Sequence, residues 1–130
     1  MLGLMQDREM MVTSVLEYAA TYFGDVEVVS RNIEGSIHRS NYRRTDARAR
    51  RLAQALARLG IRPGERVGGV SWNHSRYLEA FFGVSGMGAI LHTVNPRLFP
   101  EQLVYMINHA EDRFLLVDLG CVDIVAGILD

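Results

Sequence analysis

The stretch that decides the fold is GAILHTVNPRLFPEQLVYMINHAEDRFLLVD, residues 88–118. It contains two apolar runs, AILHTV and FLLVD, of the kind that form strands buried in a parallel sheet. Between them Pro100 can occupy a first helical position, and the apolar residues after it recur at the spacing of one helix face: Leu103, Met106, Ile107 and Ala110. The stretch therefore predicts a strand, a crossover helix and a second, parallel strand.

The same stretch carries enough polar residues to suggest a site: His92, Asn95, Arg97, Glu101, His109 and Asp112. Most of them also suit the joints of such a unit, because Asn95 precedes a proline and Glu101 falls in the positive first turn of the helix. His92 lies near the carboxyl end of its strand, the edge where open α/β sheets bind ligands. His92 and Asn95 are therefore the substrate-side candidates, although a hydrogen-bonded structural histidine is the commoner outcome there.

The rest of the chain divides into segments of different pattern. Residues 1–25 read as an N-terminal arm and helix, residues 26–40 as a hairpin, and residues 41–130 as a helix followed by strand–helix units, all in a single domain. From residue 60 the order alternates strand, helix, strand, helix, strand, helix. The predicted fold class is α/β, with an open, mostly parallel sheet and flanking helices.

Several helix ends and faces can be predicted from local sequence. Asn41 is expected to cap a helix that runs to Leu59 and stops at Gly60, and Asn73 to cap a later helix. The expected core face of the first helix is Val12, Leu16, Ala19, Ala20 and Phe23. The expected core face of the helix from residue 41 is Ala49, Leu52, Ala53, Leu56 and Leu59. The helix after Asn73 carries Tyr77, Leu78, Phe81, Phe82 and Ser85 on one face.

Composition limits the function classes. A formal net charge of −1 produces no positive electrostatic field that would attract nucleic acid or an anionic membrane. No run of apolar residues approaches the roughly 20 that are needed to span a membrane. A single cysteine, Cys121, fits a reducing cytoplasm and is expected to be a small buried hydrophobe. All 14 basic residues are arginine, so the chain cannot supply a phosphate-loop lysine or a Schiff base.

Short motifs add no catalytic, cofactor or metal residue. GVSGMG has its glycines in the wrong order for a dinucleotide fingerprint, and Ser85 falls short of a nucleophile elbow. The four histidines are not spaced as metal ligands. The arginines of the helix from residue 41 are best explained as a solvated face or as partners of acidic residues.

Three longer segments resemble a known family. They are MLGLMQDREMMVTSVLEYAATYFGDVEVVSR, RARRLAQALARLGIRPGERV and WNHSRYLEAFFGVSGMGAILHTVNPRLFPEQLVYMINHAEDRFLLVD, and with the pieces between them they cover essentially the whole chain. They resemble the opening of medium- and long-chain fatty-acid–CoA ligases of the adenylate-forming, AMP-binding superfamily. The pieces HTVNPRL and INHAEDRFLLVD are the most specific to this subgroup.

The resemblance implies a reaction that needs ATP, Mg²⁺ and coenzyme A: a fatty acid forms an acyl-adenylate and pyrophosphate, and coenzyme A then displaces AMP. It also implies that this chain is the first, incomplete portion of the large N-terminal domain, inert alone, with an N-terminal region that can contribute to a homodimer. The family's catalytic motifs lie later and match no position here. Two alternatives stay open: a non-catalytic oligomerisation or binding module, and a small independent nucleotide-binding protein.

Overall fold

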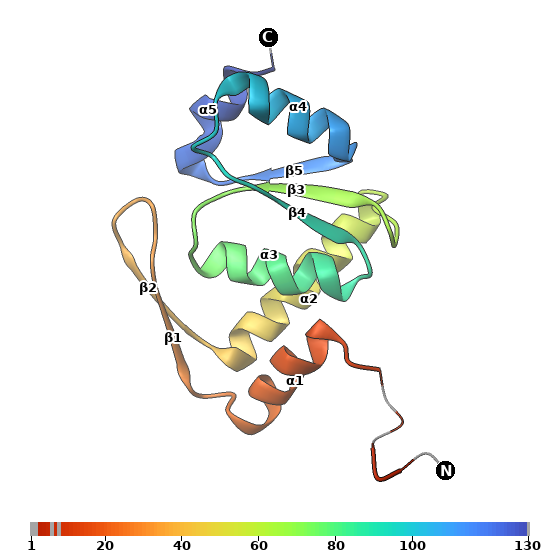
Figure 1. The fold of residues 1–130 in the computed structure, drawn as a ribbon. Helices are drawn as coiled ribbons and strands as arrows, with labels where there is room; N and C mark the ends of the chain where they lie inside the picture. The colour runs from red at the N-terminus through yellow and green to blue at the C-terminus, as the bar shows by residue number, and fades with distance from the viewer. Residues whose placement is uncertain (1–2, 6, 8, 130) are drawn as a thin grey trace.

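Three parallel strands form the centre of the molecule in the computed structural model, which describes residues 3–5, 7 and 9–129 (Figure 1). The strands are β3 (Arg66–Val70), β4 (Ile90–Val94) and β5 (Phe114–Val117), in the order β4-β3-β5. Val67 lies opposite Leu91 on one side and Phe114 on the other. The quoted stretch does form a strand, a helix and a parallel strand, and the fold class is α/β as predicted.

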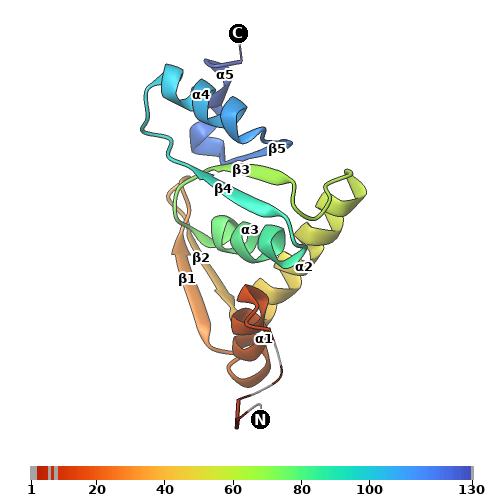
Figure 2. The ribbon, with the colours of Figure 1, turned by 45° about the vertical axis from the view of Figure 1, so that its right-hand side comes forward.

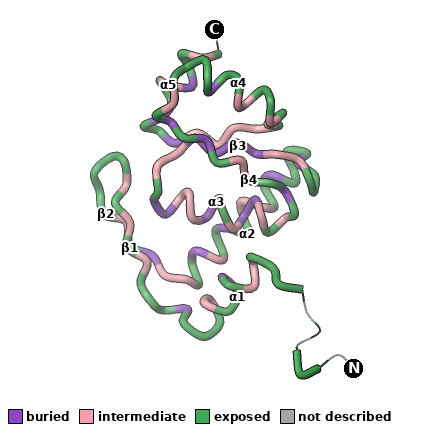
Figure 3. Tube along the Cα trace, in the orientation of Figure 1, coloured by how far each residue is buried: buried purple, intermediate pink, exposed green. Residues whose placement is uncertain are grey.

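Helices cover both faces of this sheet (Figure 2). One face packs against α2 (Tyr42–Arg58) and α3 (Ser75–Gly86), and the other against α4 (Pro100–Ala110) and α5 (Val122–Ala126). The remaining elements are α1 (Val12–Tyr22), β1 (Glu27–Arg31), β2 (Ile37–Asn41) and the 3₁₀ turn η1 (Leu119–Cys121). The buried residues accordingly gather along the sheet and between the helices (Figure 3).

Each face of the sheet has its own apolar core. The core under α2 and α3 consists of Leu56, Ile61, Val67, Val84 and Ala89. The core under α4 and α5 consists of Val70, Val94, Leu103, Cys121 and Val125. Because side chains alternate along a strand, Val67 and Val70 of β3 serve opposite cores. Cys121 is fully buried as predicted, and burial raises the pKa of its thiol, to which the charge of Asp118 adds.

The central strand carries two glycines because neighbours fill the space above and below it. A Cβ on Gly68 would lie 2.5 Å from Leu115 Cδ2 and 2.8 Å from Asp112 Oδ2. A Cβ on Gly69, on the other face, would lie 2.9 Å from Tyr77 Cε2. Both glycines therefore permit the close approach of other elements.

The prediction that β4 is fully buried was wrong, because β4 is an outer strand here and Ile90 is 51% exposed.

Helix α2 begins and ends where the sequence predicts. Asn41 Oδ1 accepts a hydrogen bond from Arg44 N at 2.9 Å, and Gly60 ends the helix with a φ of +94°. Some of its arginines pair with acidic residues, one of the two expected outcomes: Arg43 contacts Asp25 at 2.9 Å and Arg48 contacts Glu79 at 2.6 Å. Leu59 was assigned to the core wrongly, because it is 62% exposed.

The apolar face predicted for α3 is only partly buried. Phe81 is 40% exposed, and the core contacts come from Ala80, Gly83 and Val84 instead. The reason is close packing against α2, because a Cβ on Gly83 would lie only 2.8 Å from the carbonyl oxygen of Ala49. Small residues let the two helix backbones approach, and large residues turn outward.

In α1 only Leu16 is buried, while the predicted core residues Val12 and Phe23 are about half exposed.

Residues 27–41 form an antiparallel hairpin that is separate from the central sheet. Strands β1 and β2 pair from Glu27 with Asn41 to Arg31 with Ile37. The turn between them uses Gly35, whose φ is +89°, and its N–H donates to the carbonyl of Asn32 at 2.9 Å. Figure 1 shows the hairpin beside α3, with its tip near the end of β5.

Candidate functional site

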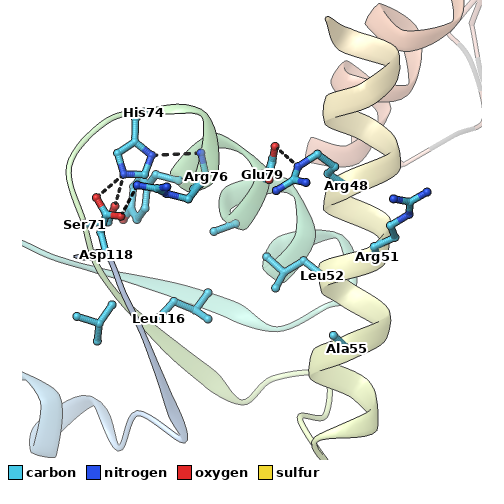
Figure 4. A pocket seen from close by; sticks show the side chains of 13 residues that line it. Arg48, Arg51, Leu52, Ala55, Ser71, His74, Arg76, Glu79, Leu116 and Asp118 are labelled. Atoms are coloured by element: carbon cyan, nitrogen blue, oxygen red, sulfur yellow. Dashed lines mark hydrogen bonds and ion pairs between the residues drawn. The ribbon is translucent and has the colours of Figure 1, made fainter. Parts of the chain in front are cut away.

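Four polar side chains meet where β3 and β5 reach their carboxyl ends (Figure 4). Ser71 follows β3, Asp118 follows β5, and His74 and Arg76 stand at the start of α3. We call these four residues the corner. They lie at one end of a groove of about 470 Å³, whose apolar wall includes Leu52 of α2 and Leu116 of β5. This is the edge at which open α/β sheets bind ligands.

His74 and Asp118 form a buried pair at the centre of the corner. Their side chains are 2% and 3% exposed, and His74 Nε2 lies 2.6 Å from Asp118 Oδ2. The other ring nitrogen, Nδ1, accepts a hydrogen bond from the backbone N–H of Arg76 at 3.2 Å. These partners assign the hydrogen to Nε2, which donates to the carboxylate. His74 is thus the N-cap of α3, and the prediction that Asn73 caps this helix was wrong.

Arg76 extends the pair toward the surface. Its Nη2 donates to Asp118 Oδ1 at 2.9 Å and to Glu34 Oε1 of the hairpin at 3.0 Å. Burial by itself raises the pKa of Asp118. The hydrogen bond from His74, the backbone N–H of Leu119 and the charge of Arg76 outweigh burial and hold this pKa below its usual value. Asp118 is therefore a carboxylate at neutral pH.

The corner does not form a serine nucleophile, although it contains Ser, His and Asp. A relay needs the serine and the carboxylate on different ring nitrogens of the histidine. Here Ser71 Oγ, at 3.3 Å, and Asp118 Oδ2 both face Nε2. The Ser71 hydroxyl instead donates to the carbonyl of Trp72 at 3.0 Å. The geometry fixes the ends of β3 and β5 relative to α3.

The far wall of the groove is tied by a second ion pair. Arg48 Nε of α2 lies 2.6 Å from Glu79 Oε1 of α3, whose side chain is 9% exposed. The hydrogen bond to Glu79 and its charge raise the pKa of Arg48. Tyr77 also lines the groove, and burial raises the pKa of its hydroxyl. The groove is therefore an apolar trough whose polar groups are mostly paired with one another.

The two residues proposed from sequence both have structural partners. His92 lies in the middle of β4, opposite Gly68, and its Nδ1 is 2.7 Å from Asp112 Oδ2. Asp112 has a fully buried side chain, and its other oxygen has no hydrogen-bond partner among the described residues. Asn95 Oδ1 accepts from Arg97 N at 3.0 Å and stabilises the turn after β4. Neither residue lines the groove, and their substrate-side role stays a prediction.

The described residues do not fit bound Mg²⁺ and ATP. Across residues 3–5, 7 and 9–129, no three His, Cys, Asp or Glu side chains gather closely enough to hold a metal ion. The chain has no lysine to contact a phosphate, and its glycine-rich segment GVSGMG falls within and after α3 rather than between a strand and a helix start. Within the part described, none of the helices is both long and apolar enough to cross a membrane.

Sequence reasoning missed the corner because its members are far apart in the chain. His74 and Asp118 are separated by 44 residues, and only the parallel pairing of β3 and β5 brings them together. A usable signal did exist. Ser71 and Asp118 each follow an apolar strand directly, and the carboxyl ends of parallel strands share one edge.

The sequence profile of the family described as "AMP-binding enzyme" matches residues 16–128. The chain belongs to this family. It is 45% identical over its full length to a 3-methylmercaptopropionyl-CoA ligase of Ruegeria lacuscaerulensis, and 48% identical over 95% of its length to a long-chain-fatty-acid–CoA ligase of Thermus thermophilus. It spans only 24% and 23% of these two relatives.

A solved structure supports the same relationship. The fold matches that of a benzoate CoA ligase from Burkholderia xenovorans with a TM-score of 0.80 and 25% sequence identity. This match covers 93% of the present chain and 24% of the ligase. The chain therefore has the fold of part of an acyl-CoA ligase, and the resemblance inferred from its sequence is confirmed.

Proposed function

We propose that this chain is the N-terminal part of an ATP-dependent fatty-acid–CoA ligase. The reaction joins a fatty acid and coenzyme A through an acyl-adenylate, and releases AMP and pyrophosphate. The observation that carries the proposal is the identity of 45–48% to CoA ligases over nearly the whole chain. A carboxylate is a poor electrophile, so adenylation is needed to turn one of its oxygens into a leaving group before the thiol attacks.

In this proposal the segment is a scaffold and supplies no catalytic residue. Mg²⁺, ATP and coenzyme A are held by residues outside the 130-residue chain. Support comes from the lack of lysine and from the pairing of the corner's charged groups with one another. The proposed location is the cytoplasm, because a single buried cysteine suits a reducing compartment.

The similarity of this segment to its relatives does not indicate the length of the acid. The two relatives are named for 3-methylmercaptopropionyl and for long-chain fatty acids, yet their identities to this chain are nearly equal. A fatty acid is proposed as the substrate class, and its chain length is left to measurement.

The test uses the protein encoded by the complete reading frame that contains this segment. Acid-dependent pyrophosphate release and thioester formation are measured with 3-methylmercaptopropionate, octanoate and palmitate, with ATP and coenzyme A added or withheld. We expect AMP and pyrophosphate as products, and thioester only when coenzyme A is present. Formation of ADP and phosphate, or no acid-dependent turnover with any acid, would refute the proposal.

Measurements on the 130-residue chain alone test whether it is a small independent nucleotide-binding protein. Calorimetry with millimolar ATP or AMP is expected to show no saturable heat. Saturable binding would instead favour a small nucleotide-binding protein.

One observation favours a second role in self-association. Helix α1 exposes an apolar stripe of Val15, Tyr18 and Tyr22, which are 64%, 58% and 69% exposed. The rings of Tyr18 and Tyr22 are 4.7 Å apart and form a ready surface for a second copy. Light scattering is expected to detect a dimer that Tyr18→Ser weakens. A monomer at all concentrations would exclude this role.

A further inference from the structure

The β1–β2 hairpin contributes little to either apolar core. Among the described strands, β1 and β2 pair only with each other. Ser40 is the one residue of these two strands that is buried. A lone two-stranded hairpin is marginal in water and depends on what it is fastened to. The position of the hairpin is therefore set by its few attachments to the rest of the molecule.

The base of the hairpin is held firmly. The backbone N–H of Arg43 donates to the carbonyl of Gly24 at 3.1 Å, and Thr45 Oγ1 donates to the carbonyl of Asn41 at 3.0 Å. Asn41 is at once the last residue of β2 and the N-cap of α2. Movement of the base would thus disrupt the start of the helix that packs on the sheet.

The tip is held by less. Both oxygens of Glu34 accept from Arg76 Nη2, at 3.0 and 3.2 Å, and the side chains of the pair are each 40% exposed. Ser30 Oγ accepts from the backbone N–H of Ser75 at 2.9 Å, which satisfies a free donor in the first turn of α3. The side chain of Ile33 lies against Gly120, where an added Cβ would come within 2.7 Å of it.

Between these two ends the hairpin bridges a hollow. A groove of about 560 Å³ separates β1 from α3, lined from the hairpin by Val28 and from the helix by Tyr77, Leu78 and Phe81. Apolar side chains therefore lie beneath β1 without being packed closely against it. Both ribbon views show the hairpin standing beside α3 as a separate arm (Figures 1 and 2).

We propose that the β1–β2 hairpin is a strap that swings open as a paired unit about its base, and that the Glu34–Arg76 contact is its fastening. Arg76 suits this role because Asp118 holds the same Nη2 at 2.9 Å and fixes the guanidinium to the sheet. Opening breaks one exposed ion pair, one hydrogen bond and the contact of Ile33. Such local openings require less free energy than unfolding of the core. The open strap exposes the groove lined by Tyr77, Leu78 and Phe81.

Amide hydrogen exchange followed residue by residue by NMR tests the proposal in the 130-residue chain. The reporter is the Ser75 amide, which is protected by Ser30 Oγ only while the strap is closed. Glu34→Gln is expected to speed exchange at Ser75 about two- to fivefold, the range set by an exposed ion pair. Cross-strand amides of the hairpin keep their protection, because the strap moves with its strands still paired.

Glu111→Gln is the matched control, because it removes another glutamate–arginine contact, with Arg66, far from the hairpin. It should leave exchange at Ser75 unchanged. Raising the salt concentration should speed Ser75 exchange in the wild type and have no further effect in Glu34→Gln, because salt screens the fastening.

Three results would overturn the proposal. Unchanged Ser75 exchange in Glu34→Gln would show that this pair fastens nothing. Faster exchange of the cross-strand amides would show that the hairpin unravels instead of swinging. Equal acceleration in α2, α3 and β3 would show that the variant acts on global unfolding.

Discussion

Replacing Asp118 by asparagine removes the negative charge from the corner while keeping the size of the side chain. In the wild type the carboxylate accepts from His74 Nε2 at 2.6 Å and from Arg76 Nη2 at 2.9 Å. An asparagine offers one oxygen, so its amide group must face one of these two donors with hydrogens of its own. One charge-assisted bond is weakened and the other becomes a repulsive contact in a site from which water is excluded.

The expected loss of stability is about 3 kcal/mol. Each hydrogen bond to a charged group contributes about 1.5–3 kcal/mol, and removing one partner of a buried pair costs about 3–5 kcal/mol. The lower end applies because Arg76 is 40% exposed and can turn to water or to Glu34. With a urea dependence of about 2 kcal/mol per molar, the unfolding midpoint should fall by roughly 1.5 M.

Urea denaturation followed by circular dichroism measures this shift. The matched control is Asp123→Asn on the exposed side of α5, which should stay within about 0.5 kcal/mol of the wild type. If Asp118→Asn is as stable as Asp123→Asn, the corner does not stabilise the fold and the reasoning is refuted.

The pH dependence provides an independent check on the same variant. The pKa of Asp118 is lowered in the folded chain, so its stabilisation is fully present above the unfolded value of about 3.9. It is lost as the pH falls through the lower folded value. The midpoints of the wild type and of Asp118→Asn should therefore converge below about pH 4, and a constant gap at all pH values would contradict the assignment.

Three further predictions concern packing, capping and the thiol. Gly83→Ala should lower the free energy of unfolding by about 1–2 kcal/mol, because the added Cβ would lie 2.8 Å from a backbone carbonyl oxygen. Gly127→Ala is the control, because its nearest atom is 3.4 Å away and the stability should not fall. Equal thermal melting temperatures for the two variants would count against the close α2–α3 packing. Arg44→Glu should stabilise the fold by about 0.3–1 kcal/mol, because it places a negative charge at the positive end of the α2 dipole, where no acid stands now. Arg58→Glu, in the last turn, should destabilise the fold because it places the same charge at the negative end. The reverse order of stabilities would contradict the contribution of the helix dipole. Cys121 should resist a thiol reagent in buffer and react in urea at the rate of unfolding; rapid labelling of the native chain would show that it is not buried.

Local sequence was enough to predict the elements and their order. The Asn41 cap, the Gly60 stop and the apolar runs around β4 and β5 depend on neighbours in the chain, and each was found in the structure. The face of α3 was not predictable in this way. Periodicity favours the larger residue Phe81 for the core, whereas the approach of Ala49 from α2 requires small residues there.

The corner, like the buried face of α3, could not be predicted from local sequence. His74 reads as a polar residue in a turn until the pairing of β3 with β5 places Asp118 beside it. His92 was noticed from sequence because its position near a strand end suggested a ligand contact, and that role stays a prediction. What sequence could not show is its partner Asp112, a carboxylate from the loop before β5.

The two glycines of β3 also restrict how this sequence can change over generations. At Gly68 the nearest atom to an added Cβ is Leu115 Cδ2 at 2.5 Å, with Asp112 Oδ2 at 2.8 Å, so an alanine there requires Leu115 to move or shrink and Asp112 to shift. Gly69 is linked in the same way to Tyr77 of α3. Positions 68 and 115, and 69 and 77, should therefore covary as pairs among descendants of this gene, and a library that randomises each pair together should recover folded combinations that no single substitution reaches.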